Sequence, residues 1–264
     1  MNDTLVEESL GDVLYENNVS YGKHVLGEYH PSQVTGCPLK VFLDWMTDDE
    51  TVLNSWLFQG SAVHYYLQET GLMTDALNRA GYHPVDTSYE VPTQKQVSDD
   101  VNITGKCDII CTKDGETTIF DIKYSSLPPS SGHGRLYKYM SQANTYAHMF
   151  GADSYGLIMI NSKSRDLVDD IVVMPGEMSE DNWETVKDKA HSIHNALQTF
   201  GYSTDNRWTK TQLDEKDNGF WKEKMKFFDK NQIPSYEKEC QYCSHSDYCP
   251  VKNGKLGGVK SLIN

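Results

Sequence analysis

The chain has 264 residues, of which 38% are hydrophobic and 11% aromatic. This composition supplies a sizeable core and excludes a disordered tail or a fibrous repeat. The 38 acidic residues outnumber the 24 Lys and Arg, which gives a net charge of -14. A generally basic surface is therefore excluded, and a polyanion would have to dock on a local basic region. Residues 219–264 form such a region, with 8 basic and 5 acidic residues.

Membrane and secretion signals are both missing from the sequence. No uninterrupted apolar run approaches the roughly 20 residues of a membrane helix, and the first eight residues lack the basic and apolar regions of a signal peptide. We therefore expect a cytoplasmic protein without membrane attachment. No linker rich in Pro, Gly or Ser divides the sequence, which favours one domain with terminal elaborations.

Hydrophobic periodicity predicts mixed helices and strands. Residues 1–30 show no convincing periodicity and are expected to form an N-terminal arm. A hairpin turn is expected at Lys113-Asp114-Gly115. In sequence order the expected elements are helices at 37–46 and 53–70, strands at 88–91, 101–112 and 116–124, a helix at 136–150, strands at 155–161 and 168–174, and helices at 179–200 and 218–231.

Three cysteines are closely spaced near the C-terminus. Cys240, Cys243 and Cys249 form C-x2-C-x5-C in a polar segment, and Pro250 follows the last of them. In a reducing compartment such cysteines are typical of metal ligands rather than disulfides. A proline after the last ligand is also found in bacterial ferredoxins. The spacing predicts a metal centre that needs a fourth ligand.

Cys37 is the best candidate for this fourth ligand. It lies where a loop enters a helix, whereas Cys107 and Cys111 lie in an apolar, strand-like run. Cys37 and Cys240 are 203 positions apart, so the centre would join the two ends of the protein. Zinc remains an alternative, held by the four thiolates or by the three C-terminal ones with His245.

Carboxylates and a lysine interrupt two neighbouring apolar strands. Asp108 lies in the second expected strand, and Asp121-Ile122-Lys123 lies in the third. Alternation along a strand places Asp121 and Lys123 on one face and Ile122 on the other. Two carboxylates beside a lysine suit a divalent-metal site, where the lysine would hold or deprotonate a water or neutralise charge on phosphorus. A surface ion pair and a turn residue are the alternatives.

Two helices carry further candidate residues. Gln142 and Tyr146 are four apart and share a helix face, where they offer hydrogen bonds and a stacking surface. Gly60 and His64 also share a face, and a glycine there would free space beside the imidazole. Packing and a core histidine are the alternatives. Tyr65 and Tyr66, which follow His64, are expected in the core.

In their order along the sequence, these motifs resemble those of RecB-like PD-(D/E)XK nucleases. The resemblance is to the iron-sulfur branch that contains CRISPR-associated and phage-encoded RecB-like exonucleases. It covers most of the sequence and is carried by Gly60-x3-His64, Gly105-x2-Asp108, Asp121-Ile122-Lys123, Gln142-x3-Tyr146, and Cys37 with Cys240, Cys243 and Cys249. Asp121 stands where many members have Glu.

The resemblance implies an α/β fold with a restriction-endonuclease-like core. A central mixed sheet would be flanked by helices, and an iron-sulfur subdomain would join the N- and C-terminal segments. The expected organisation is an arm at 1–30, a nuclease core at 31–235 and a cysteine-rich segment at 236–264 that completes the cluster site with Cys37.

The resemblance also implies roles for individual residues. Glu90, on the strand before Asp108, would support the metal site indirectly or lie on the surface. The four cysteines named above would hold a [4Fe-4S] cluster. His64, Asp108, Asp121 and the carbonyl of Ile122 would bind Mn2+ or Mg2+, Lys123 would position the water, and Gln142 and Tyr146 would hold the DNA strand or brace the lysine.

The implied activity is exonucleolytic hydrolysis of single-stranded DNA ends, 5′ to 3′. It would serve recombination, repair, replication or spacer acquisition in a prokaryotic or virus-infected cell, with recombination or CRISPR-integration proteins as partners. An alternative is a DNA-end-binding adaptor subunit of such a complex. Phosphate contacts are expected from His133, Arg135 and Lys138, and residues 220–228 would form either a DNA-facing helix or an amphipathic packing helix.

Overall fold

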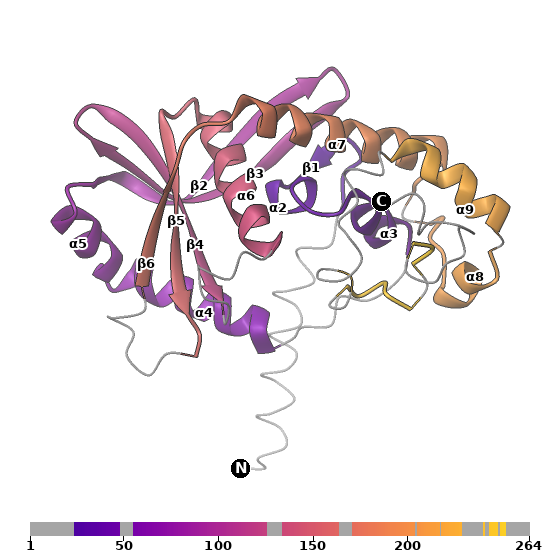
Figure 1. Ribbon diagram of the computed structural model, residues 1–264, viewed down its shortest axis with the longest axis horizontal. Coiled ribbons are helices and arrows are strands. Elements are labelled where there is room, and N and C mark those ends of the chain that lie inside the picture. Colours follow the sequence, from indigo (N-terminus) through magenta and orange to yellow (C-terminus); the bar gives the residue numbers. More distant parts are fainter. Residues whose placement is uncertain are drawn as a thin grey trace, which may run out of the picture.

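The computed structural model describes residues 24–47, 55–125, 134–163, 171–203, 205–216, 218–228, 240, 243–247 and 249–251. These residues form a mixed sheet with helices against both of its faces (Figure 1). The expected α/β architecture with a central mixed sheet is confirmed. No helix in these ranges combines the length and the apolar character that crossing a bilayer requires.

Six strands make up the sheet. The order is β1-β3-β4-β5-β6, and β2 pairs with β3 outside this path. The β1–β3 and β4–β5 pairs are parallel, and the other pairs are antiparallel. The strands are β1 (Glu28–Tyr29), β2 (His83–Ser98), β3 (Val101–Lys113), β4 (Glu116–Ser125), β5 (Ser154–Asn161) and β6 (Ile171–Gly176).

The predicted hairpin joins β3 to β4. Asp114 and Gly115 form the two-residue connection, with φ angles of 53° and 88°. A tight turn of this kind needs positive φ at both positions, which Asp tolerates and Gly adopts freely. The turn therefore fixes the register that brings Asp108 and Asp121 toward each other at the far end of the hairpin.

β3 and β4 separate at that far end. Their backbone pairing ends at Ile109 and Phe120. Farther along β3, the short strand β1 pairs with Asn102 and Ile103. Between these two pairings, the carboxylate of Asp108 accepts a hydrogen bond from the backbone N–H of Ile122 at 2.6 Å. A side chain thus replaces the backbone ladder where the strands diverge.

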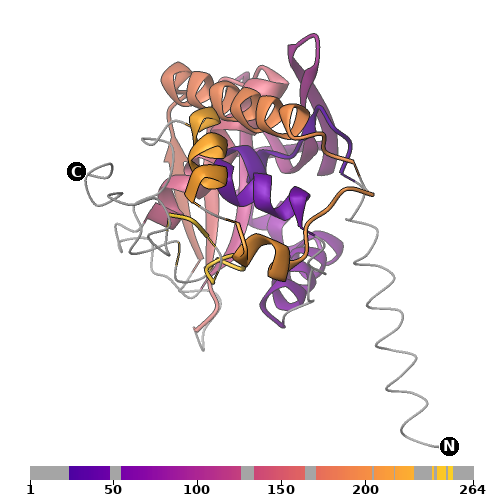
Figure 2. The same ribbon diagram turned by 90° about the vertical axis from the view of Figure 1, so that its right-hand side faces the viewer.

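Helices cover the sheet from two sides, as Figures 1 and 2 show. Residues of α3, α6 and α7 belong to the larger core cluster, with Leu157 and Met159 of β5. Residues of α5 belong to a second cluster, with Ile158 and Ile160 of the same strand. The helices are α2 (Pro31–Val34), α3 (Pro38–Met46), α4 (Ser55–Glu69), α5 (Leu72–Arg79), α6 (Gly134–Phe150), α7 (Glu180–Thr199), α8 (Lys210–Asp214) and α9 (Asn218–Lys224), which a 3-10 turn (Met225–Phe227) follows.

The helix α3 packs against segments from much later in the sequence. The ring of Phe42 lies 5.7 to 6.1 Å, centroid to centroid, from the rings of Phe200, Trp208 and Phe228. Arg207 donates hydrogen bonds to the carbonyls of Trp45 and Asp44. Helix α3, from the N-terminal part of the sequence, is therefore held by the C-terminal third of the described residues.

Two expectations about packing were wrong. Tyr65 and Tyr66 are 66% and 57% exposed, because they lie on the side of α4 that faces away from the sheet's core. Tyr29 is fully buried, so the end of the expected N-terminal arm belongs to the core; residues 1–23 lie outside the described ranges. In α9, Trp221 and Lys224 are buried, so one face of this helix packs against the core. Lys222 and Lys226 are exposed, and a DNA-facing role for them stays a prediction.

Candidate active site

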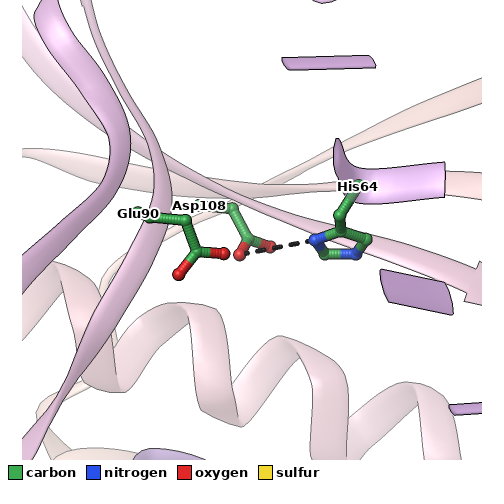
Figure 3. A group of neighbouring side chains, drawn as sticks. All are labelled: His64, Glu90 and Asp108. Carbon is green, nitrogen blue, oxygen red and sulfur yellow. Dashed lines mark ion pairs between the residues drawn. The ribbon is translucent and has the colours of Figure 1, made fainter. Parts of the chain in front are cut away.

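An imidazole and two carboxylates meet where β3 and β4 separate. His64 comes from α4, Glu90 from β2 and Asp108 from β3 (Figure 3). One ligand atom from each residue lies within 4.8 Å of the others. The Nδ1 atom of His64 is 3.7 Å from Oδ1 of Asp108. Among the described residues, no other group of three or more His, Cys, Asp or Glu side chains lies so close together.

Glu90 enters this group directly, although its sequence position suggested only an indirect role or a surface position. Its neighbours Tyr89 and Val91 pair with Ile109 and Cys107, so Glu90 lies opposite Asp108 across the two strands. Its φ of 52° is left-handed, which costs a residue with a side chain roughly 1 to 2 kcal/mol. Strain held at one strand position beside two potential ligands indicates a functional constraint.

The backbone of Ile122 lies between His64 and Asp108. Its N–H donates to Asp108, and a hydrogen bond with its backbone acts to raise the pKa of His64, although burial and the charge of Lys123 lower that pKa overall. The Ile122 side chain is fully buried in the second core cluster, so the predicted alternation along β4 is confirmed. This packing holds the backbone of Ile122 at the site, where its carbonyl was predicted to bind metal.

Asp121 is turned toward Lys123. Its Oδ2 atom lies 2.7 Å from Nζ of Lys123 and has no hydrogen bond of good angular geometry. Asp121 is 1% exposed, and this burial raises the pKa of its carboxyl. The charges of Lys123 and Asp108 act on it in opposite directions. Asp121 thus lies beside Asp108, but its oxygens are outside the group of three ligand atoms.

Lys123 is held as a cation. Burial by itself would lower its pKa, but the carboxylates of Asp121 and Asp108 outweigh burial and raise it. The ammonium group also lies 5.5 Å from the centre of the Tyr139 ring. A protonated lysine donates hydrogen bonds and stabilises negative charge, so here Lys123 suits holding a water or a phosphate oxygen rather than removing a proton.

Gln142 and Tyr146 face the same region from α6. They are 8% and 2% exposed, and a hydrogen bond joins their side chains. Burial raises the pKa of Tyr146, and the charges of Asp121 and Asp108 raise it further. The hydroxyl therefore lies within electrostatic reach of both carboxylates. The face that Gln142 and Tyr146 were predicted to share thus points to the candidate site.

No sequence pattern indicated that His30 belongs here. Its Nε2 atom lies 3.4 Å from the hydroxyl of Tyr146, across a sequence separation of 116 residues. His30 precedes a four-residue helix and is part of no motif, so only the tertiary structure brings it to the site. Gly60, in contrast, would have no described atom within 4 Å of an added Cβ atom, so its lack of a side chain does not clear space for His64.

The residues present fit a divalent cation. Mg2+ and Mn2+ prefer carboxylate and carbonyl oxygens, and a nearby imidazole completes such a donor set. The buried carboxylate of Asp121 lies in the same region, where its Oδ2 atom is paired with Lys123. His64, Glu90 and Asp108 would hold the ion, with Asp121 and the carbonyl of Ile122 beside them.

Three of the cysteines predicted as cluster ligands lie near one another. Burial raises the pKa of the Cys37 thiol to about 12, and the nearby Cys249 and Cys240 contribute to that shift. Cys37 is the residue that precedes α3, and its thiol makes no capping hydrogen bond there. Cys107 and Cys111 are fully buried in the sheet, as their strand-like surroundings predicted.

His245, the alternative zinc ligand, has another partner. Its Nε2 atom lies 2.6 Å from Oδ1 of Asp44 on α3, and His245 is 2% exposed. The second oxygen of Asp44 pairs with Lys40 at 2.6 Å. This contact joins the segment around Cys243 to α3, and a zinc ion would have to bind His245 through Nδ1.

The expected phosphate contacts are only partly described. His133 and the side chain of Arg135 lie outside the described residues. Lys138 is half-buried, and its Nζ would lie 3.2 Å from a Cβ atom at Gly36, next to Cys37. Lys138 therefore lies close to Cys37 and is not a fully exposed surface lysine.

Glu90→Gln tests the assignment of Glu90 as a ligand. We expect the divalent-metal concentration for half-maximal stabilisation to rise about tenfold, because one charged donor of the group is lost. Thermal unfolding over a Mn2+ titration measures this concentration. Glu116→Gln, at the exposed turn between β3 and β4, is the matched control. If the two variants needed the same Mn2+ concentration, Glu90 would not be a metal ligand but a surface residue.

Comparisons with known proteins agree with this architecture. No curated protein matches the sequence significantly. The solved structure of a protein called SSO0001 has 16% identity and a TM-score of 0.55, and the match covers 94% of this protein and 97% of that one. This likeness concerns the fold.

Two solved exonucleases have lower scores. The alkaline exonuclease LHK-Exo from Laribacter hongkongensis has 10% identity and a TM-score of 0.45, and the match covers 66% of this protein and 89% of that one. A phage related exonuclease from Haemophilus somnus 129PT has 12% identity and the same TM-score, with coverage of 67% and 96%.

The sequence family is shown by a separate comparison. The model of the PD-(D/E)XK nuclease superfamily matches residues 47–250, which is more than half of the sequence and includes every residue of the candidate metal site. The chain belongs to the PD-(D/E)XK nuclease superfamily.

Proposed function

We propose that the protein is a metal-dependent DNA exonuclease that digests single-stranded ends, in the 5′ to 3′ direction. The observation that carries the proposal is the group of His64, Glu90 and Asp108 beside the Asp121–Lys123 ion pair. Nucleases of this superfamily use divalent metals such as Mg2+ or Mn2+. The donor set of this protein is appropriate for either ion.

The side chains of the site have complementary roles in phosphodiester hydrolysis. A divalent ion would act as a Lewis acid that polarises the phosphodiester. Lys123, held protonated by its carboxylate neighbours, donates hydrogen bonds to the water or to the negative charge that develops on the phosphate oxygens. Gln142 and Tyr146 offer hydrogen bonds to the strand from the opposite side.

Exposed aromatic rings support single-stranded DNA as the substrate. Tyr65 and Tyr66 directly follow His64 on α4, and Tyr137 begins the helix that carries Gln142; all three are more than half exposed. Bases of a single strand stack on such rings, with little dependence on sequence. Because the net charge is -14, few phosphate contacts are available, and stacking would supply much of the affinity.

A [4Fe-4S] cluster on Cys37, Cys240, Cys243 and Cys249 is part of the proposal, as is membership of the RecB-like branch. The proximity of Cys37 to Cys240 and Cys249 supports the split ligand set. Such a nuclease would act in recombination, repair, replication or spacer acquisition, with proteins of those systems as partners.

Degradation of end-labelled single-stranded DNA with Mn2+ tests the activity. We expect the wild-type protein to release short labelled products and Lys123→Ala to be at least about 1000-fold slower, because the developing charge loses its cation. The position of the label reports the polarity. Lys95→Ala removes an exposed lysine from β2 and should retain full activity.

The other outcomes are equally informative. If neither the wild type nor Lys123→Ala degrades DNA while both bind its ends, the protein is a DNA-end-binding adaptor rather than a catalyst. Equal activity of the two proteins would mean that Lys123 is not the catalytic lysine.

A further inference from the structure

His30 is oriented by the first turn of the short helix α2. Its Nδ1 atom accepts a hydrogen bond from the backbone N–H of Ser32 at 3.3 Å and lies 2.9 Å from the Ser32 hydroxyl, which can donate to it as well. The backbone N–H of His30 donates to the side chain of Gln33 at 2.8 Å. In a neutral imidazole one nitrogen accepts while the other carries the proton. Because Nδ1 is the acceptor, the neutral ring carries its proton on Nε2.

The protonated edge of His30 faces Tyr146. The distance from Nε2 to the tyrosine hydroxyl is 3.4 Å, and the two rings meet edge to face with 6.4 Å between their centroids. Desolvation of the imidazole and the charge of Lys123 both lower the pKa of His30. The ring is therefore neutral at physiological pH, and Nε2 donates its proton to the hydroxyl oxygen.

Gly105 makes this approach possible. A Cβ atom at this position would lie 2.9 Å from Cδ of Pro31, 3.0 Å from the Tyr146 hydroxyl and 3.2 Å from Nε2 of His30. Gly105 lies within β3 and does not have a positive φ, so no turn requires glycine here. What the position requires is space, at the point where α2 and α6 meet on the strand that carries Asp108.

These contacts determine what Tyr146 can do. A tyrosine hydroxyl has one proton to donate and accepts through its oxygen. The oxygen receives the N–H of His30, and the side chain of Gln142 is a second hydrogen-bond partner. The hydroxyl proton is thereby directed away from His30, in a region close enough to Asp121 and Asp108 for their charges to act on Tyr146.

We infer that His30 is a positioning residue of the nuclease, which holds the Tyr146 hydroxyl as a hydrogen-bond donor toward the substrate strand at the metal site. The inference rests on the proposed function, because it assigns a task within that reaction. It adds a residue from the N-terminal segment to a site that is otherwise built from residues 64–146.

Two substitutions separate this role from the capping of α2. Asn places its amide oxygen where Nδ1 lies, so His30→Asn keeps the contact with Ser32 and loses the contact with Tyr146. Gln places its amide nitrogen where Nε2 lies, so His30→Gln keeps a donor for Tyr146 and loses the cap. We expect kcat for Mn2+-dependent digestion of single-stranded DNA to fall about tenfold in His30→Asn, with KM within about twofold of wild type. His30→Gln should retain at least half of the wild-type kcat.

Thermal unfolding should show the opposite order. A helix cap contributes to stability, so His30→Gln should have a lower unfolding midpoint than the wild type. His30→Asn keeps the cap and should have the same midpoint as the wild type. His83→Ala is the matched control, since His83 is an exposed histidine at the start of β2 whose contact is with Asn78. It should leave kcat and KM unchanged.

Combining substitutions tests whether His30 acts through Tyr146. In a Tyr146→Phe background, His30→Asn should cause no further loss of kcat, because the hydroxyl that it positions is already gone. Gly105→Ala should reproduce the loss of kcat with both side chains intact, because its methyl group separates them.

Each contrary result has a distinct meaning. Wild-type kcat in His30→Asn, or losses that add fully with Tyr146→Phe, would overturn the positioning role while leaving the nuclease assignment intact. A wild-type protein that does not hydrolyse DNA would overturn the proposed function and the role of His30 with it.

Discussion

Replacing Asp108 with Asn is expected to abolish phosphodiester hydrolysis and to stabilise the metal-free fold near pH 8. The loss of activity should be at least about 1000-fold, because the Asp108 carboxylate belongs to the candidate metal-ligand group and lies next to His64 in it. The gain in stability should be about 1 to 2 kcal/mol, since a buried charge is replaced by a neutral group that still accepts the N–H of Ile122.

The sign of the pH dependence follows from the carboxyl's pKa. Burial raises the pKa of Asp108 to about 6, although Lys123 and the Ile122 N–H oppose the shift. The unfolded protein has a value of about 3.9. Between these two pH values the folded protein binds more protons than the unfolded one, so the free energy of unfolding falls as pH rises through this window. The stabilising effect of Asp108→Asn should therefore be small near pH 4 and complete above about pH 6.

Thermal unfolding near pH 4 and at pH 8, with a chelator present to remove divalent metal, measures the effect. Asp99→Asn, in the exposed turn between β2 and β3, is the matched control and should not change the midpoint. Mn2+ should raise the midpoint of the wild type at pH 8 and should not raise that of Asp108→Asn. Lower stability of Asp108→Asn at pH 8 would contradict the assignment.

Replacing Cys37 with Ser should produce the largest loss of stability. Cys37 directly precedes α3 and lies near Cys240 and Cys249. The cluster proposed above would bridge these distant positions and contribute much of its binding free energy to folding. We expect the unfolding midpoint to fall by about 10 °C or more, and the broad absorbance of the cluster at about 400 nm to disappear. Limited proteolysis should then cleave the protein beyond the end of α9.

Cys111→Ala provides the control for this experiment. Cys111 is fully buried within β3, so its replacement should lower stability modestly through packing and leave the absorbance unchanged. Full absorbance in the Cys37 variant would place the fourth ligand elsewhere. A colourless wild-type protein that contains zinc by elemental analysis would replace the cluster with a structural zinc site.

Strong local patterns made most of the sheet predictable. The strands β3, β4 and β5 alternate or run apolar, and Asp114-Gly115 marks the turn, so their bounds were predicted within one residue. The strand β2 extends from His83 to Ser98, much farther than 88–91. It contains Pro84 and Pro92 and many polar residues, and it is held by pairing with β3 rather than by its own pattern. The helix α5 was missed for a similar reason, because only Met73 and Leu77 are buried.

The candidate site was predictable where motifs are local and not where contacts are distant. Asp121, Ile122 and Lys123 could be placed from strand alternation, and Gln142 and Tyr146 from helix spacing. Glu90 became a candidate ligand only once the β2–β3 register was known, although its place in a polar strand gave a weak signal. His30 gave none, since its role depends on a contact with Tyr146 that no local pattern encodes.

The packing of α3 has a consequence for how the protein is synthesised. Phe42 and Trp45 leave the ribosome more than 150 residues before Phe200, Tyr202 and Trp208, which cover them in the finished fold. Until then the nascent polypeptide exposes the apolar helix α3. Contacts of such sequence separation delay folding and favour aggregation of incomplete polypeptides. Efficient production should therefore depend on chaperones that hold the N-terminal half, and premature termination before α9 should yield insoluble fragments.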